Sequence, residues 1–341
     1  MSLKRIVIGF LVAILLLIAI FLYLLFFWRA DTRLDPDWRI NRHTTNAEGA
    51  ITVRFTGTST LLFSDGQTQW MTDGWFSRPN ITQLLITKKI SPDLPAIEKG
   101  LARNKVENLA AVIPLHSHYD HAMDSPEVAR RTGAMLMGSE STANIGRGWG
   151  LPEDQIAIFE NRVPVTLGAF TITPIETSHF QFGDTRLIKI DLNDPEITEP
   201  LIPPVSARDY KLGKAYALHV AHPRGNFVIV GSAGFGDGDL EGYDADLIFL
   251  GIGGLGQKSQ DYQNAYWRET VTSVGASRVI PIHFDSLTAP ITGDFKGADF
   301  IASLALGFEN TLPEFFASKL VSHPELKIET LPRYDKTVII E

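Results

Sequence analysis

The chain has 341 residues, of which 21% are charged and 44% hydrophobic, and its formal net charge is -8. These proportions fit one large or two ordinary globular domains and exclude a wholly disordered chain. The absence of Cys excludes disulfides, iron–sulfur clusters, thiolate metal sites and a Cys nucleophile, so any metal must be bound by His, Asp or Glu. The acidic balance argues against a nucleic-acid partner.

Residues 6–28 form an uncharged apolar run that follows Lys4 and Arg5 and precedes Arg29. As a helix this run is about 34 Å long, enough to cross a hydrocarbon core of about 30 Å. A buried core helix would normally have a polar face, and the apolar part of a cleaved signal peptide is about 7–15 residues long. We therefore predict that residues 1–28 are a single-pass anchor in the lipid bilayer. The simplest orientation places the rest of the chain on the non-cytoplasmic side, although the positive charges do not decide it.

The polar residues 29–48 are expected to be a juxtamembrane linker, and residues 49–341 a single domain. In chain order the patterns predict strands at 51–57, 58–65 and 67–74, a helix at 92–103, a buried strand at 109–115, a helix at 125–132, strands at 169–176, 186–191, 215–221, 227–231 and 246–250, a helix at 258–274, a strand at 278–282 and a helix at 297–319. This mixture of hairpins and strand–helix alternation predicts an α/β fold.

Three of the nine His residues fall within one hexapeptide, His116-Ser-His118-Tyr-Asp120-His121. The buried strand 109–115 delivers this hexapeptide at its carboxyl end, where functional sites concentrate. Imidazoles and a carboxylate so close together are costly to bury unpaired, and they are good ligands for zinc. The hexapeptide therefore predicts a metal site.

Two further His residues follow apolar strands in the same way. His179 comes after strand 169–176, and His283 comes directly after strand 278–282. We expect both to complete the metal site. The remaining His residues are interpreted as structural or as surface residues; they are His43, His219, His222 and His323.

The hexapeptide, with His179 and His283 downstream in that order, resembles the metallo-β-lactamase superfamily, and the resemblance covers about residues 50–341. It implies a four-layer αββα sandwich and a hydrolase domain at residues 49–341. Asp73-Gly74 resembles the first motif of that family, in which the Asp supports the metal loop instead of binding metal. The segment 57–60 is similar to the phospholipase- and lactonase-like branches of the superfamily.

The chain departs from the family pattern at Ser232, where an Asp that bridges two metals usually stands. The resemblance to the β-lactamase subclass without a bridging carboxylate implies two zinc positions, one bound by His116, His118 and His179 and the other by Asp120, His121 and His283. Asp237 and Asp239 are alternative ligands, a single-metal site remains open, and manganese or iron are alternatives to zinc.

Three protein ligands per zinc leave an open position for water, which is typical of a catalytic site. Zinc lowers the pKa of water from 15.7 toward about 7, so hydroxide is available near neutral pH. We expect Asp120 to be the catalytic residue that orients this hydroxide. The predicted reaction is hydrolysis of an ester, amide or phosphodiester bond without a covalent intermediate.

Aromatic residues flank every predicted metal loop, and they either line an apolar substrate pocket or pack beneath the loops. They are Trp75, Phe76, Phe180, Phe182, Phe235 and Phe284. Together with the anchor they favour a lipid or acylated substrate, as in the branch that resembles N-acyl phosphatidylethanolamine phospholipase D. A lactonase, a β-lactamase and a metal-binding protein with weakened catalysis are the alternatives, and the sequence does not decide the oligomeric state.

One further motif, a Gly-rich segment, would by itself indicate dinucleotide binding. Residues 251–256 match the Gly-rich dinucleotide pattern G-x-G-x-x-G, but they lie late in the chain instead of opening a domain. We interpret them as a Gly-rich loop of the hydrolase fold.

Overall fold

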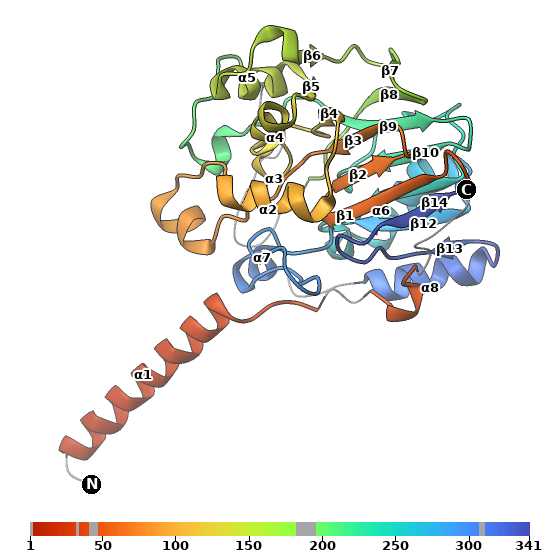
Figure 1. The fold of residues 1–341 in the computed structure, drawn as a ribbon. Helices are drawn as coiled ribbons and strands as arrows, with labels where there is room; N and C mark the ends of the chain where they lie inside the picture. Colours follow the sequence, from red (N-terminus) through yellow and green to blue (C-terminus); the bar gives the residue numbers. More distant parts are fainter. Residues whose placement is uncertain (1–2, 32–33, 41–46, 182–195, 307–310) are drawn as a thin grey trace.

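The computed structural model describes residues 3–31, 34–40, 47–181, 196–306 and 311–341. Two sheets are stacked face to face, helices cover their outer faces, and one long helix projects away from this body (Figure 1).

The first sheet has the strand order β14-β1-β2-β3-β4-β5-β6. Its strands are β1 (Ile51–Gly57), β2 (Thr60–Ser64), β3 (Gln69–Thr72), β4 (Leu109–Ile113), β5 (Met135–Gly138), β6 (Ile156–Ile158) and β14 (Thr337–Ile340). β1, β2 and β3 are antiparallel neighbours, whereas β3 to β6 run parallel. The carboxyl ends of β3 and β4 therefore meet at one edge of the sheet, which brings the loops that follow them together.

The second sheet has the order β13-β12-β11-β10-β9-β8-β7. Its strands are β7 (Val165–Leu167), β8 (Phe170–Thr177), β9 (Ala215–Ala221), β10 (Phe227–Val230), β11 (Leu247–Gly251), β12 (Arg278–Ile282) and β13 (Lys327–Ile328). β7 to β10 are antiparallel and β10 to β13 are parallel.

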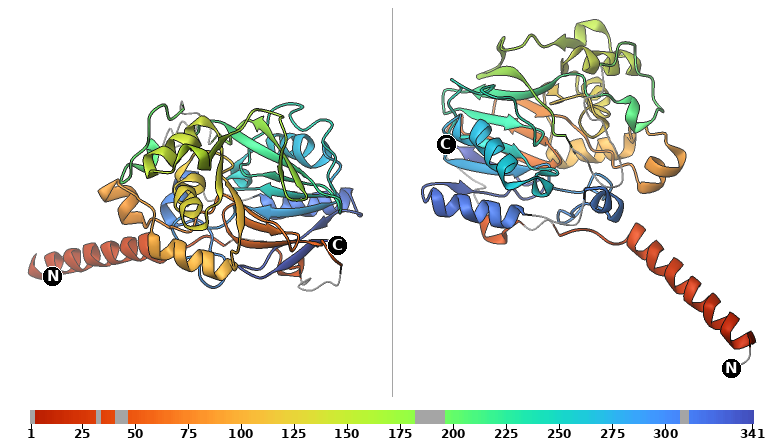
Figure 2. Two further views of the ribbon diagram at one scale, coloured as in Figure 1. Left: turned by 45° about the horizontal axis from the view of Figure 1, so that its top comes forward. Right: turned by 180° about the vertical axis from the view of Figure 1, so that it is seen from behind.

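The helices connect these strands on the outer faces (Figure 2). They are α2 (Leu94–Asn104), α3 (Tyr119–Ala122), α4 (Ser125–Thr132), α5 (Glu140–Trp149), α6 (Gln260–Trp267), α7 (Phe300–Leu306) and α8 (Leu312–Ser322). The remaining long helix, α1 (Leu3–Phe26), precedes β1 and projects away from the body (Figure 1). Short 3₁₀ turns lie at Pro36–Trp38, Glu153–Gln155, Ala207–Asp209 and Leu255–Gln257, and π turns at Gln83–Thr87 and Arg268–Thr272. Side chains cap several starts: Asp93 accepts from the Ala96 amide, and Ser139 from the Thr142 amide.

Three hydrophobic clusters fill the spaces between the layers. Between the sheets, the ring of Phe63 stacks on Trp70 at 4.5 Å and on Phe227 at 5.0 Å. A second cluster lies between the first sheet and the helices α2 and α4, and a third between the second sheet and the helices α6 and α8. The structure thus confirms the predicted four-layer αββα sandwich.

β1, β9, β12 and α4 have the bounds predicted from the sequence. The single helix predicted at residues 297–319 is wrong, because α7 and α8 are separate helices. Pro313 stands in the first turn of α8, where its missing amide donor costs nothing, and it would break a continuous helix. The prediction did not include β5, β6, β7 and α5, and the strand predicted at 186–191 lies outside the described residues.

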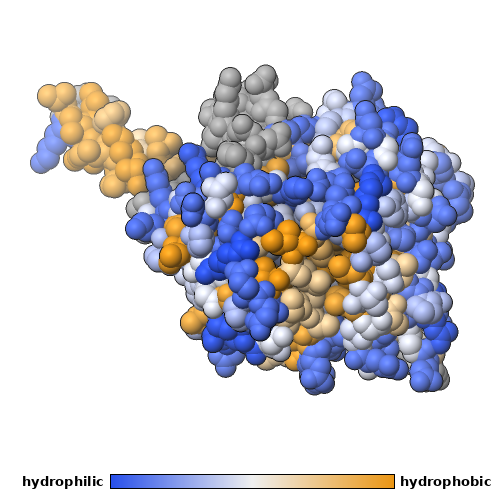
Figure 3. All heavy atoms as spheres, turned by 90° about the horizontal axis from the view of Figure 1, so that it is seen from above, coloured by the Kyte–Doolittle hydropathy of each residue, from blue (hydrophilic) through white to orange (hydrophobic). Residues whose placement is uncertain are grey.

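α1 is apolar along most of its length, in contrast to the largely hydrophilic face of the body, which surrounds an apolar hollow (Figure 3). Within the described residues it is the one helix long and apolar enough to cross a membrane, and none of its residues is buried. A buried core helix is therefore excluded, whereas both an anchor and a signal sequence fit this description.

The segment after α1 lies against the domain. The Trp28 ring packs edge-on against Phe300 of α7 at 6.1 Å, and the Ala30 amide donates to the Ala298 carbonyl. Further along, Trp38 packs edge-on against Phe316 of α8 at 5.7 Å. The described part of the predicted linker is thus docked on the domain.

Candidate metal centre

The hexapeptide leaves the end of β4 through a fixed turn. The Leu115 amide donates to Asp73 Oδ1 at 3.0 Å, and the Ser117 amide donates to the Leu212 carbonyl at 3.1 Å. His118 then serves as the residue before α3, and its carbonyl accepts from the His121 amide. This path explains how one short loop presents several ligating side chains to the same space.

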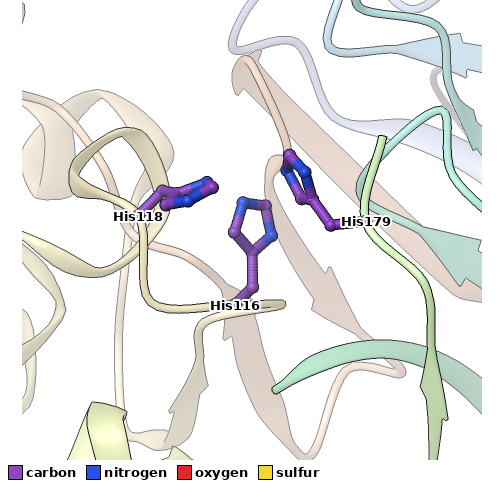
Figure 4. Close-up of side chains that lie close together, drawn as sticks. All are labelled: His116, His118 and His179. Carbon is purple, nitrogen blue, oxygen red and sulfur yellow. The ribbon is translucent and has the colours of Figure 1, made fainter. Parts of the chain in front are cut away.

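His116, His118 and His179 form the first group, and their rings turn toward one another (Figure 4). Ring centroids are 4.8 Å apart for His116 and His118 and 4.6 Å apart for His116 and His179. His179 Nδ1 donates to the Phe180 carbonyl at 2.7 Å, which leaves its Nε2 unprotonated in the neutral ring. His116 Nε2 is buried and has no hydrogen-bond partner. A bound cation at this position would explain why a buried ring nitrogen has no hydrogen-bond partner.

Burial and the neighbouring imidazoles keep this first group neutral. Burial lowers the pKa of His118 to about 4. Burial, and after it the nearby His rings, also lowers the pKa of His116 and of His179 well below the ordinary value. Neutral imidazole is the form that binds metal, so the group is ready to bind a metal ion at neutral pH.

Asp120, His121 and His283 form the second group. His121 Nε2 and His283 Nε2 are 3.2 Å apart, and Asp120 Oδ2 lies 3.6 Å from the first and 3.3 Å from the second. Neighbouring ligand atoms around a tetrahedral zinc ion are about 3.3 Å apart, given bonds of about 2.0–2.1 Å. The three atoms are therefore already spaced as three corners of a zinc tetrahedron.

Asp73 fixes the tautomer of His121. His121 Nδ1 donates to Asp73 Oδ2 at 2.8 Å, and both side chains are fully buried. In the neutral ring this bond leaves Nε2 unprotonated, facing the other two acceptors of the group. Burial lowers the pKa of His121, but the carboxylates of Asp73 and Asp120 outweigh burial and raise it. The site thus favours a positive charge at this point, and a metal ion supplies one.

Asp120 is held ionised. Burial raises the pKa of its carboxyl group, but His121, His283 and the other imidazoles outweigh burial and lower it. The two groups adjoin, since the rings of His116 and His121 are 3.8 Å apart. All six predicted ligands are therefore brought together, in the two sets that the sequence indicated.

Ser232 lies beside the first group. Its Oγ accepts the Phe180 amide at 2.8 Å, directly after His179, so it supports the His179 loop. Asp237 and Asp239 belong to neither of the two groups found in the described part of the chain. The family pattern predicts Ser232 as a residue that supports the metal ligands, but its Phe180 partner, 52 positions away, is not apparent from the sequence.

The flanking aromatic side chains are engaged in packing. Trp75 packs edge-on against Tyr119 at 5.9 Å, and Phe76 belongs to the cluster under α2 and α4. Phe180 is buried, whereas Phe235 and Phe284 are half-buried on the cluster around α6. Phe182 lies outside the described residues, and the predicted apolar pocket stays a prediction.

The Gly-rich loop 251–256 serves the metal site. A Cβ at Gly253 would meet His283 Nδ1 at 2.6 Å, so only glycine lets the His283 ring approach. Of the other described His residues, His219 Nε2 donates to the Asp244 carbonyl, His222 lies 3.6 Å from Asp65, and His323 is 3.5 Å from Glu325. None of these three belongs to either metal group, and His43 lies outside the described residues.

The stacked sheets carry at their edge two His/Asp groups that could each hold a metal ion. The family model of the beta-lactamase superfamily domain matches residues 90–284, and the chain belongs to this superfamily.

The chain is also similar to proteins of known sequence or structure. It is 26% identical over 180 residues to a "UPF0173 metal-dependent hydrolase" of Chloroflexus aurantiacus, which covers 52% of this chain and 65% of the relative's length. The isothiocyanate hydrolase from Delia radicum gut bacteria has a TM-score of 0.51 at 16% identity, over 86% of this chain and 99% of that one. A possible metal-dependent hydrolase from Veillonella parvula has a TM-score of 0.50 at 13% identity, over 86% and 100%. At these sequence identities, both structural similarities show a shared fold alone.

Proposed function

We propose that this protein is a membrane-anchored, zinc-dependent hydrolase that cleaves an ester, amide or phosphodiester bond of a lipid or acylated substrate. The observation that carries the proposal is the pair of adjoining three-ligand groups at the edge of the sandwich. The similarity to a metal-dependent hydrolase supports it.

The donor set favours zinc, with manganese or iron as alternatives. Five imidazoles and one carboxylate, without Cys, suit a borderline divalent ion. When bound at three protein ligands, zinc supplies a Lewis acid that lowers the pKa of water and polarises the bond to be cleaved.

The chain's own residues provide orientation and charge. Both groups are preorganised, because Asp73 fixes the His121 ring and the Phe180 carbonyl fixes the His179 ring. The ionised carboxylate of Asp120 lies beside His121 Nε2 and His283 Nε2, where its oxygens would hold the metal and orient water. This role requires no covalent intermediate with the protein.

The chain directly after α1 is joined to the segment that follows His283, which supports a substrate drawn from the bilayer. Arg29 forms an antiparallel bridge with Asp299, on the segment between His283 and α7. The Ala30 amide also donates to the Ala298 carbonyl, so the chain that leaves α1 is bonded to this segment at two neighbouring residues. A lipid headgroup at the membrane surface would therefore be close to the ligands.

A second candidate is a metal-binding protein that does not turn substrate over, and Ser232 in place of a carboxylate favours it. Full-length protein in lipid vesicles, loaded with zinc or manganese, separates the two when tested on ester, lactone, β-lactam and phosphodiester substrates. We expect hydrolysis that is lost in Asp120→Asn and kept in the exposed matched control Asp261→Asn. Full metal loading without turnover on any substrate would favour the binding protein.

The substrate class is tested with pairs that share a headgroup and differ in acyl chain length. We expect the long-chain member in vesicles to be cleaved faster than the soluble short-chain member. Equal rates on both would contradict a bilayer substrate.

A further inference from the structure

Two residues with left-handed backbone conformations lie side by side behind the second metal group. Thr58, in the turn between β1 and β2, has a φ of 53°, and His283, directly after β12, has a φ of 57°. The Thr58 carbonyl accepts the His283 amide at 2.7 Å. For a β-branched residue such as Thr this backbone conformation is strained, so the surrounding structure must hold it in place.

The side chain of Asp285 fixes the backbone of Thr58 in this conformation. Its Oδ1 accepts the Thr58 amide at 2.5 Å, and its side chain is only 3% exposed. Thr58 is therefore bonded on both sides to the loop that carries His283, through its amide to Asp285 and through its carbonyl to His283. Because residue 285 lies two positions after the ligand, these two bonds clamp the loop at both ends of the His283 turn.

Two arginines surround the other oxygen of the same carboxylate. The Nη2 atoms of Arg78 and Arg333 are each 3.9 Å from Asp285 Oδ2. Arg78 Nη2 also donates to Thr58 Oγ1 at 3.3 Å, and Arg333 Nη1 donates to the Thr56 carbonyl. The buried Asp285 carboxylate thus holds two buried guanidinium groups against the turn at residues 56–58. Removal of the carboxylate would leave both positive charges buried without their partner, which is costly.

The turn is shaped for this carboxylate. Gly57 has a φ of 133°, and a Cβ at this position would meet Asp285 Oδ2 at 2.4 Å. Any other residue would displace the carboxylate from its place between the guanidinium groups.

We propose that Asp285 is a positioning residue: through Thr58 it holds His283 in the orientation that completes the metal position of Asp120, His121 and His283. This inference rests on the proposed function, with one metal ion held by each of the two three-ligand groups; this is the two-metal function. It assigns a supporting role to a pair of segments 227 residues apart in the chain.

The test is a titration of metal-free full-length protein in detergent with Co²⁺, followed by absorption of the bound ion. We expect two binding steps in the natural protein. In Asp285→Asn an amide NH₂ group replaces one carboxylate oxygen, and the anion between the two guanidiniums is lost. We therefore expect the Co²⁺ affinity of the second binding step, at Asp120, His121 and His283, to fall about 10–100-fold. The absorption spectrum of that step should change, whereas the first step should keep its affinity and spectrum. Asp294→Asn removes the same charge from an exposed position of the same loop, and both of its steps should remain.

If Asp285→Asn does not fold, Gly57→Ala displaces the carboxylate while keeping every charge, and it should weaken the second step alone. Two unaltered steps in a folded variant would overturn the clamp and leave the two-metal function standing. If both Co²⁺ affinities fell equally and the melting temperature fell as well, the variant would have destabilised the whole protein. That result would overturn the proposal that Asp285 positions His283. A single step in the natural protein would refute the two-metal function, and the inference with it.

Discussion

Asp73→Asn should reverse the favoured tautomer of His121 and thereby weaken metal binding by the group of Asp120, His121 and His283. Asp73 accepts from the Leu115 amide and from His121 Nδ1 at once, and it has a left-handed backbone, which Asn tolerates well. The Asn side-chain oxygen can keep the bond to Leu115. Its NH₂ group then faces His121 Nδ1, which favours the proton on Nε2, the nitrogen that a metal ion needs.

The expected loss of metal affinity follows from the replacement of the Asp73 carboxylate by an amide. Metal binding to His121 in the variant requires two donors to face each other in a fully buried place. Loss of such a supporting partner weakens metal affinity about 10–100-fold, which corresponds to about 1.4–2.7 kcal/mol. Since Asn also replaces the charged partner of His121, the metal-free protein should lose about 1–3 kcal/mol of unfolding free energy.

The assay is a chelator competition that measures the affinity of each metal step, with unfolding in denaturant measured alongside. Asp65→Asn is the matched control, because Asp65 is also buried and accepts two backbone amides, from Gln67 and Thr68, in the turn between β2 and β3. We expect the control to keep both affinities. Unchanged affinity of the second metal in a folded Asp73→Asn protein would refute the tautomer argument.

Of three further predictions, two concern the metal groups and one concerns Asp124, a buried carboxyl group that accepts the Phe76 and Ser77 amides. The double variant His116→Ala plus His118→Ala should lose at least the first metal in elemental analysis, and unchanged metal content would contradict the assignment. Burial raises the pKa of Asp124 from 3.8 to about 6, so its contribution to stability is present below pH 4 and is lost as the pH rises through 6. Asp124→Asn cannot ionise, and its unfolding free energy relative to the natural protein should therefore rise by about 2 kcal/mol between pH 4 and pH 7, measured on metal-free protein; a pH-independent difference would refute this. Gly253→Ala should weaken the second metal by pushing the ring of His283 aside, measured by the same chelator competition, and equal affinity would show that the loop adjusts.

The sequence alone located the metal centre and the apolar helix. The hexapeptide after a buried strand, followed by His179 and His283 at later strand ends, is a local signal, because each ligand is marked by its own apolar strand and ligands concentrate in the loops after strands. An uncharged run as long as residues 6–28 likewise needs no tertiary information to be recognised as apolar helix.

Other features were decided by tertiary contacts. The short strands β5, β6 and β7 have too few residues to show a period, and they exist because neighbouring strands pair with them. The contact between His121 and His283 spans 162 residues, and that between Thr58 and Asp285 spans 227. Such pairs depend on how the two sheets stack, so periodicity and motif spacing carry no record of them. The sequence therefore identified the ligands, whereas only the folded chain could place the residues that hold those ligands in position.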